Sequence, residues 1–323
     1  MSRAVLVRET GGPEVMHLEE RRLGPPEPGQ VHIRQHAIGL NFVDVYQRNG
    51  LYRQDLPFVP GNEGAGEVLA VGDGVDVFAP GDRVAYSSVV GAYAEERMIA
   101  ADRLVPLPDD IDYETAAAVM LKGSTAWYLL FETWPLKAGE TILFHAAAGG
   151  VGLIACQWAR ALGARVIGTV GSDDKRHLAL AHGCHEVIDY SREDFAARVR
   201  DLTGGRGVDA VYDGVGQATF EASLDCLRPR GLMVSFGNAS GPVSIPNLGI
   251  LATKGSLYVT RPTTGTYFRD GSAIRTAASA LFAAIASGAI RVTIGQRFTL
   301  SEIGEAHRAL EARRTTGSTV ILP

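Results

Sequence analysis

The N-terminal part of the chain alternates short apolar runs with turn-forming residues. Gly- and Pro-rich segments, including GGPE, PPEPGQ, VPGNEG and APGD, separate the runs at residues 4–7, 31–41, 64–72 and 82–86. Runs of this length bounded by Gly and Pro are typical of strands joined by turns. We therefore expect a compact, mainly antiparallel β unit. Apolar residues at helical spacing then predict helix across residues 112–135, with Asp112 or Thr115 as N-cap.

From Thr141 the pattern alternates strand with helix. The predicted strands are residues 141–146, 164–170, 186–190, 208–216, 231–238 and 254–260. The predicted helices between them are residues 153–162, 173–182, 191–202 and 220–227, the third opening at Ser191. This alternation indicates βαβ units in a doubly wound parallel sheet, an α/β fold. The tail adds helices at 278–290 and 302–314 and a last strand at 319–323.

Composition narrows the class of protein. Hydrophobic residues make up 46% and charged residues 21% of the 323 positions, and the formal net charge is −5. This balance gives no sign of a polyanionic partner such as nucleic acid. The three widely spaced cysteines fit a reducing compartment better than a disulfide framework. With neither a signal peptide at the N-terminus nor an apolar run of membrane-spanning length, we expect a cytoplasmic protein.

The string HAAAGGVG, residues 145–152, lies between the first predicted strand of the alternation and its helix. It nearly matches the dinucleotide-binding pattern G-x-G-x-x-G, with Ala147 at the first glycine position. Alanine is tolerated there if φ stays negative. A pyrophosphate would bind the N–H groups at the helix start; the alternative is a core turn without a ligand. The predicted contacts are Ala148, Gly149, Gly150, Val151 and Gly152.

The end of the second strand bears on the choice between NADP and NAD. A carboxylate about 20 residues after the glycine loop binds the ribose 2′-hydroxyl in NAD sites. Here Ser172 follows the strand and Lys175 comes one turn later, which favours a 2′-phosphate and hence NADPH. Asp173 and Asp174 stand between them, either stabilising the next helix or reversing the preference. Tyr190 is a candidate to flank the phosphate, or a half-buried strand aromatic.

Segments throughout the chain resemble the quinone oxidoreductase (zeta-crystallin-like) family, the zinc-free branch of the medium-chain dehydrogenase/reductase superfamily. The matching segments are GLNFVDVYQRNGLY, PGNEGAGEV, HAAAGGVG, LTGGRGVDAVYDGVG, LRPRGLMVSFGNASGPV and KGSLYVTRP. The resemblance implies a GroES-like, mainly β catalytic domain formed by residues 1–124 and 265–323. It also implies an inserted Rossmann domain at residues 125–264, NADPH as cofactor, and reduction of quinones.

The resemblance also predicts a metal-free enzyme. Zinc-dependent relatives have a cysteine where this chain has Asn41, and a histidine beside glutamate where it has Asn62 and Glu63. Asparagine is a poor zinc ligand. His307 is expected to be an ordinary helix residue. Without a Lewis acid, the substrate must accept a hydride easily, as a conjugated quinone does.

Candidate catalytic residues follow from the same resemblance. Asn41 and Asp44 match residues near the nicotinamide and its ribose, and Thr125 matches a residue at the nicotinamide end. Tyr46 or Tyr52 is a candidate hydrogen-bond or proton donor to the forming oxyanion. Alternatively, Asn41 only caps a turn and Tyr46 only lines the cleft, so that catalysis rests on proximity.

The remaining predicted cofactor contacts lie at the ends of the fifth and sixth strands, and one lies near the last helix. They are Phe236, Gly237, Asn238, Val259, Thr260, Arg261 and, more weakly, Arg314. The sixth strand would lie at a sheet edge, and exposed edges tend to be paired or covered. The resemblance implies that this edge pairs with its mate across a two-fold axis, so we predict a homodimer through the sixth strand.

Two other functions stay open at this point. One keeps the fold and NADPH but takes an enone or 2-alkenal as substrate, because both acceptors are flat and conjugated. The other is an NADPH-regulated RNA-binding protein, as some zeta-crystallin relatives are. The acidic balance and the lack of a basic stripe with interleaved aromatics argue against RNA.

Overall fold

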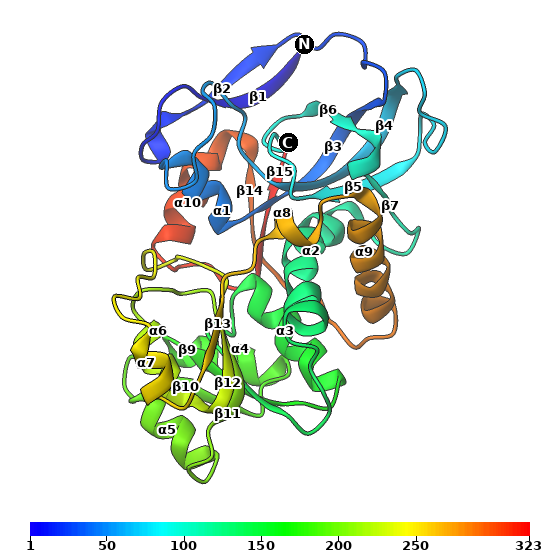
Figure 1. Ribbon diagram of the computed structural model, residues 1–323. Helices are drawn as coiled ribbons and strands as arrows, with labels where there is room; N and C mark the ends of the chain where they lie inside the picture. The colour runs from blue at the N-terminus through cyan, green and yellow to red at the C-terminus, as the bar shows by residue number, and fades with distance from the viewer. The chain divides into compact units, whose positions relative to one another are not determined.

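The computed structural model describes all 323 residues, and contacts within the chain divide them into two compact units (Figure 1). The β-rich unit comprises Met1–Ser124, Phe268–Ala286 and Val292–Pro323, and the α/β unit comprises Thr125–Tyr267 and Ser287–Arg291. The predicted second boundary follows residue 264, and the division by contacts follows Tyr267. The short segment 287–291 belongs with the α/β unit because Gln157 accepts a hydrogen bond from the Arg291 N–H and donates one to its carbonyl.

The β-rich unit is built on a seven-stranded sheet in the order β14-β15-β3-β4-β5-β7, with β6 paired to the other end of β3. All its pairs are antiparallel except β14 with β15. A separate hairpin joins β1 and β2. The strands are β1 (Ser2–Val7), β2 (Met16–Arg21), β3 (Gln30–Leu40), β4 (Glu63–Val71), β5 (Arg83–Ser87), β6 (Glu96–Ala100), β7 (Val105–Pro106), β14 (Ile294–Thr299) and β15 (Ser318–Leu322).

The helices of the β-rich unit connect these strands and cover their core. They are α1 (Phe42–Arg48), α9 (Gly271–Ala286), α10 (Ile303–Glu311) and the short 3-10 helices η1 (Pro13–Val15), η2 (Ala101–Arg103) and η4 (Leu300–Glu302). The helix α2 (Tyr113–Trp127) ends in the α/β unit. Of the two predicted caps for α2, Asp112 makes the bond, because its Oδ1 accepts from the N–H of Thr115 at 2.6 Å. Apolar residues of β3, β4, β5 and α10 share one buried core.

The α/β unit contains the predicted doubly wound parallel sheet. Its strands are β8 (Thr141–Phe144), β9 (Arg165–Val170), β10 (Glu186–Asp189), β11 (Val208–Asp213), β12 (Leu227–Ser235) and β13 (Tyr258–Thr260). They lie in the order β10-β9-β8-β11-β12-β13, all parallel. Every residue of β8 and β11 is buried, as expected for central strands covered on both faces. The strand order reverses between β8 and β11, where doubly wound sheets bind ligands.

The helices of this unit are the π-helix η3 (Tyr128–Thr133), α3 (Gly150–Ala161), α4 (Asp173–Ala181), α5 (Phe195–Leu202), α6 (Phe220–Cys226), α7 (Gly249–Thr253) and α8 (Thr264–Tyr267). Of these, α3, α4, α5 and α6 pack against strands of the sheet. One pair of packed helices is α3 with α4, and another is α5 with α6. The predicted start of α5 at Ser191 is wrong. Asp194 caps this helix through the N–H groups of Ala196 and Ala197, while Ser191 donates to Asp189 in the preceding turn.

The three cysteines, Cys156, Cys184 and Cys226, are free and buried. Hydrogen bonding to Cys184 and burial raise the pKa of the Cys156 thiol well above its ordinary value. Burial likewise raises the pKa of Cys226 to about 12. No helix combines the length and the apolar character that crossing a bilayer requires.

Candidate functional site

The glycine-rich string forms the turn from β8 into α3. The N-cap of α3 is Gly149, which has no side chain to cap the helix, and the first turn carries no acidic residue. The Leu153 N–H donates to the carbonyl of the N-cap residue Gly149 at 2.9 Å. The N–H groups of Gly150, Val151 and Gly152 come before this donor in the chain and have no acceptor within the helix. These N–H groups and the helix dipole make a site for an anion. The residues present therefore fit the pyrophosphate of a dinucleotide.

Close packing explains how the loop tolerates alanine in place of the first glycine. The positive φ of this turn falls on Ala146, at 53°, and not on Ala147. The buried methyl group of Ala147 lies over β9, where a methyl added at Gly168 would be only 2.7 Å away. A methyl added at Gly152 would lie 2.5 Å from the Ala146 carbonyl oxygen. The chain thus places alanine against a glycine of the neighbouring strand.

The string begins with a buried histidine, His145, which was not among the predicted site residues. His145 Nδ1 lies 2.9 Å from the Thr169 hydroxyl, and Nε2 lies 2.8 Å from the Ser223 hydroxyl. Because Ser223 donates to the Thr219 carbonyl, Nε2 of His145 must carry the proton and Nδ1 must accept. Burial lowers the pKa of His145, so the ring is neutral at pH 7. Its signal in the sequence was a polar residue at the end of a buried strand.

The ends of β9 and β10 bring the predicted 2′-phosphate residues together. Val170 pairs with Asp189 at the last position of both strands. Ser172 is the N-cap of α4 and makes no capping bond with its side chain, which leaves the hydroxyl available. A methyl added at Gly171 would lie 2.8 Å from the Tyr190 hydroxyl oxygen, so Tyr190 reaches across to this loop. Lys175 stands in the first turn of the same helix.

The ends of β12 and β13 form the other half of the sheet edge. Arg261 donates through Nη1 to the carbonyls of Ser235 at 2.8 Å and Gly237 at 3.1 Å. Arg261 therefore joins the ends of these strands, and the segment from Phe236 to Asn238 lies beside it. Val259 and Thr260 are half-buried next to β12. All these predicted contacts lie at the carboxyl edge of one sheet.

In the β-rich unit, Asn41 belongs to a buried ionic cluster. The Glu63 side chain has no exposed surface, and its Oε1 accepts from Asn41 Nδ2 at 2.7 Å and from Lys122 Nζ at 2.5 Å. Its Oε2 accepts from the Leu121 N–H at 2.6 Å. On the neighbouring strand β3, Gly39 pairs with Glu63 and leaves room for its carboxylate. A methyl group added at Gly39 would lie 2.2 Å from Glu63 Oε1.

This cluster is a poor fit for the zinc ion of the zinc-dependent relatives. Two of the three matching positions are the amides Asn41 and Asn62, and the third, Glu63, is already paired with the buried ammonium of Lys122. No group of three or more His, Cys, Asp or Glu side chains elsewhere is placed to hold a metal ion. Chemistry without a metal stays a prediction, and the donor set here favours it.

The Asp44 side chain is buried and enclosed by hydrogen-bond donors of the protein. Its side chain has no exposed surface and accepts from the Asn41 N–H at 2.9 Å, Asn62 Nδ2 at 2.6 Å and the Tyr93 hydroxyl at 2.8 Å. Burial raises the pKa of Asp44 to about 6, against the effect of these hydrogen bonds. Asp44 holds Asn41 at the start of α1. Its contact with the cofactor stays a prediction.

His307 is the centre of a buried network rather than an ordinary helix residue. Arg48 donates to His307 Nδ1 at 2.9 Å and forms a bidentate pair with Glu311. Burial and Arg48 lower the pKa of His307 to about 3, so the ring is neutral. Nε2 therefore carries the proton and donates to Tyr93, whose hydroxyl donates to Asp44. The signal in the sequence was a histidine on the apolar face of an amphipathic helix.

The other predicted catalytic residues differ in accessibility. The rings of Tyr46 and Tyr52 meet edge to face at 5.2 Å, but Tyr46 is only 7% exposed and Tyr52 is 36% exposed. Of the two tyrosines, Tyr52 is therefore the more exposed. Thr125 is buried in α2 and belongs to the α/β unit, whereas Asn41 belongs to the β-rich unit. Arg314 is exposed and 3.4 Å from Glu305, within the β-rich unit.

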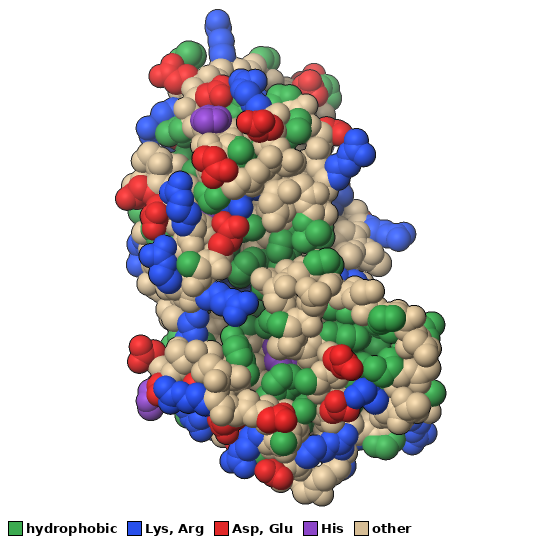
Figure 2. All heavy atoms as spheres, turned by 90° about the vertical axis from the view of Figure 1, so that its left-hand side faces the viewer, with side chains coloured by type: hydrophobic (Ala, Val, Ile, Leu, Met, Phe, Trp, Pro, Cys, Tyr) green, Lys and Arg blue, Asp and Glu red, His purple; other side chains and the backbone are tan.

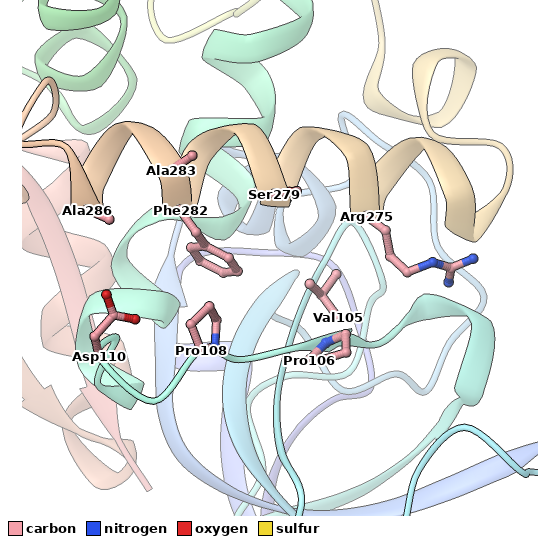
Figure 3. A pocket seen from close by; sticks show the side chains of 9 residues that line it. All are labelled: Val105, Pro106, Pro108, Asp110, Arg275, Ser279, Phe282, Ala283 and Ala286. Carbon is pink, nitrogen blue, oxygen red and sulfur yellow. The ribbon is translucent and has the colours of Figure 1, made fainter.

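Two hollows in the β-rich unit are lined by other residues. One, of about 430 Å³, separates α9 from the segment 105–110, and its lining is mainly apolar between Asp110 and Arg275 (Figure 3). The other, of about 310 Å³, is lined by Thr10 and by residues of the segment 50–56. Neither lining contains a predicted catalytic or cofactor residue.

Comparisons with known proteins extend over the whole chain. A family model for the alcohol dehydrogenase GroES-like domain matches residues 27–109, and one for zinc-binding dehydrogenases matches residues 150–284. The chain is 56% identical to a quinone oxidoreductase of Pseudomonas aeruginosa and 43% identical to a 2-haloacrylate reductase of a Burkholderia species. These matches cover all of this chain and at least 99% of each relative.

A solved structure supports the same relationship. The crystal structure of Escherichia coli quinone oxidoreductase complexed with NADPH matches with a TM-score of 0.97 and 48% identity. The match covers 100% of both chains. The predicted fold class, a GroES-like domain with a Rossmann-type parallel sheet, is confirmed.

The fit of the glycine loop predicts the effect of one added methyl group. In Gly152→Ala, the new Cβ would lie 2.5 Å from the Ala146 carbonyl and 2.7 Å from the Ala147 carbonyl, so the loop must move. We expect NADPH binding, measured by calorimetry, to weaken by about tenfold or more. As a control, Gly265→Ala adds a methyl with nothing within 4 Å and should leave binding unchanged. Equal affinities in both variants would contradict the packing argument.

The buried ion pair predicts a loss of stability that depends on charge. Lys122→Met leaves Glu63 buried and unpaired, which should lower the free energy of unfolding by about 3–5 kcal/mol in urea titrations. The double variant Lys122→Met, Glu63→Gln removes the buried charge and should recover part of this loss. The exposed pair of Arg297 and Glu114 is the control, and Arg297→Met should change stability by less than about 1 kcal/mol. Full stability of Lys122→Met would refute the account.

Proposed function

The chain belongs to the quinone oxidoreductase family of medium-chain dehydrogenases/reductases, and from this we propose that it transfers hydride from NADPH to a quinone without a metal ion. The observation that carries the proposal is the turn from β8 into α3, where a helix start without a side-chain cap follows a central strand of a six-stranded parallel sheet. Identity of 48–56% over the full length of three relatives named quinone oxidoreductase supports it.

Binding and orientation are the tasks of the protein's own residues in this proposal. NADPH, when bound, supplies the hydride, and a conjugated quinone accepts it without strong polarisation of its oxygen. The N–H groups from Gly150 to Gly152 hold the pyrophosphate, while Ser172, Lys175 and Tyr190 hold the 2′-phosphate.

The β-rich unit contributes positioned donors. Because Glu63 and Asp44 hold its side chain and its N–H, Asn41 has a single orientation. Asn41 is 9% exposed. We propose that this small exposed part of its side chain contacts the substrate or the nicotinamide. Tyr52, the more exposed phenol, is the proposed hydrogen-bond donor to the reduced oxygen. The contacts proposed for Thr125, for the residues ending β12 and β13, and for Arg314 rest on resemblance.

An enone or 2-alkenal is the second candidate substrate. The relative named 2-haloacrylate reductase, 43% identical over the whole chain, supports this candidate. A haloacrylate, like an enone, has a C=C bond conjugated with a carbonyl group. A flat conjugated acceptor is common to both classes. RNA binding has less support, because Figure 2 shows basic and acidic side chains intermingled on the visible face, and the net charge is −5.

We place the protein in the cytoplasm, as the three free, buried cysteines support. We further propose a homodimer formed through β13. This strand ends the sheet order, so its outer edge has no partner within the chain. Tyr258 on it is 59% exposed. Two copies joined edge to edge about a two-fold axis would make one continuous sheet.

Light scattering tests the dimer. At micromolar protein the measured mass should be twice the 34.4 kDa of one chain. Tyr258→Lys adds a charge to the sheet edge and should shift the mass toward that of one chain. Val77→Lys, at a position 74% exposed in the β-rich unit, is the matched control and should stay dimeric. A wild-type mass of one chain would refute the dimer.

Turnover assays test the proposed reaction. Protein treated with a chelator should oxidise NADPH with a small benzoquinone or an ortho-quinone, and more slowly with NADH as donor, because NADH lacks the 2′-phosphate. An α,β-unsaturated aldehyde is the third acceptor, and turnover of the aldehyde alone would favour the second candidate. Dependence on added zinc would refute the metal-free mechanism. Equal rates with both nucleotides would refute the role of Ser172 and Lys175.

A further inference from the structure

An ion pair joins the loops that follow β9 and β10. Arg192 Nη1 lies 2.9 Å from Asp173 Oδ2, although the two residues are 19 positions apart in the chain. The contact arises because β9 and β10 are neighbours and end level with each other, at Val170 and Asp189. Both side chains are largely exposed, at 67% and 57%, so the pair contributes little to folding. Its position suggests another use.

Asp173 stands where a carboxylate would select NAD. It follows Ser172 directly at the start of α4, beyond the end of the second strand of the nucleotide fold. In NAD sites an acidic residue in this region accepts a hydrogen bond from the ribose 2′-hydroxyl. The same carboxylate repels a 2′-phosphate, which carries between one and two negative charges at neutral pH, as phosphate monoesters do. An unpaired Asp173 would therefore oppose NADPH.

The charge balance of this edge depends on Arg192. Three cations, Lys175, Arg176 and Arg192, stand among four carboxylates, which are those of Asp173, Asp174, Asp189 and Glu193. The guanidinium of Arg176 already faces Glu193 at 3.6 Å. Besides Asp173, Arg192 faces the buried Oδ2 of Asp189, which has no hydrogen bond, at 3.8 Å. Without Arg192 two carboxylates would lose their nearest cation.

We propose that Arg192 is a specificity-determining residue, which makes the loop after β9 accept a 2′-phosphate by neutralising Asp173. The guanidinium withdraws Asp173 Oδ2 from the ribose and cancels its charge beside Ser172 and Lys175. The inference rests on the proposed use of NADPH and adds a residue from the neighbouring strand end to the phosphate site. In this account Asp173 would select NAD if it were unpaired, and its ion pair with Arg192 prevents this.

Binding measurements on four proteins test this proposal without turnover. Dissociation constants for NADPH, NADH, 2′,5′-ADP and 5′-AMP are measured by calorimetry for wild type, Arg192→Ala, Asp173→Asn and the double variant. Arg192→Ala should weaken NADPH and 2′,5′-ADP by about tenfold, the effect of one uncompensated charge nearby. It should leave NADH bound at least as tightly as in wild type, because the released Asp173 carboxylate can accept from a ribose 2′-hydroxyl. The double variant removes the exposed carboxylate together with its partner. It should therefore bind 2′,5′-ADP nearly as tightly as wild type.

The rescue separates neutralisation from direct contact. If the double variant stays as weak as Arg192→Ala, Arg192 acts by binding the phosphate itself, and the proposal is overturned. An unchanged ratio of NADPH to NADH affinity in Arg192→Ala also overturns it. Arg198→Ala is the matched control, because this substitution removes the same charge as Arg192→Ala. Arg198 lies on α5, is half-exposed, and faces Glu193 at 3.8 Å. A wild-type protein that binds no nucleotide would instead refute the proposed function.

Discussion

The nucleotide site depends on how closely the start of α3 approaches the ends of β8 and β9. Methyl groups added at Gly152 or Gly168 would come within 2.7 Å of the neighbouring loop, so this region has no volume to spare. That closeness, rather than any charged side chain, brings the free N–H groups of α3 to the edge of the sheet. Ala147, at the first glycine position of HAAAGGVG, is compatible with this close approach because the neighbouring strand β9 has a glycine, Gly168, opposite its methyl group.

In the β-rich unit, by contrast, charged side chains are held inside the core. Glu63, Lys122 and Arg48 are almost completely buried, and each is held by an ion pair or several hydrogen bonds. Such groups are costly to bury and tolerate little displacement. Asn41 takes its orientation from them through Glu63 and Asp44. The rigidity of one amide thus depends on residues that do not reach the solvent.

Local patterns predicted the architecture, but partners distant in the chain escaped prediction. Alternating strands and helices identified the parallel sheet, and the glycine loop was found from its place between strand and helix. The helix start at Asp194 was missed because Ser191 bonds to the preceding turn instead. Nothing local could reveal that His307 bonds to Tyr93, or that Arg192 faces Asp173, because strand order and helix packing bring these pairs together.

The buried cysteines bear on the chemistry that such an enzyme must survive. Quinones and enones are electrophiles, and the thiolate is the form of cysteine that attacks them. Here all three thiols are enclosed by the α/β unit, and the pKa values of Cys156 and Cys226 are raised, which disfavours their thiolates at neutral pH. The folded protein therefore offers its proposed substrates no ready sulfur nucleophile. Resistance to self-arylation follows from the packing of the nucleotide fold.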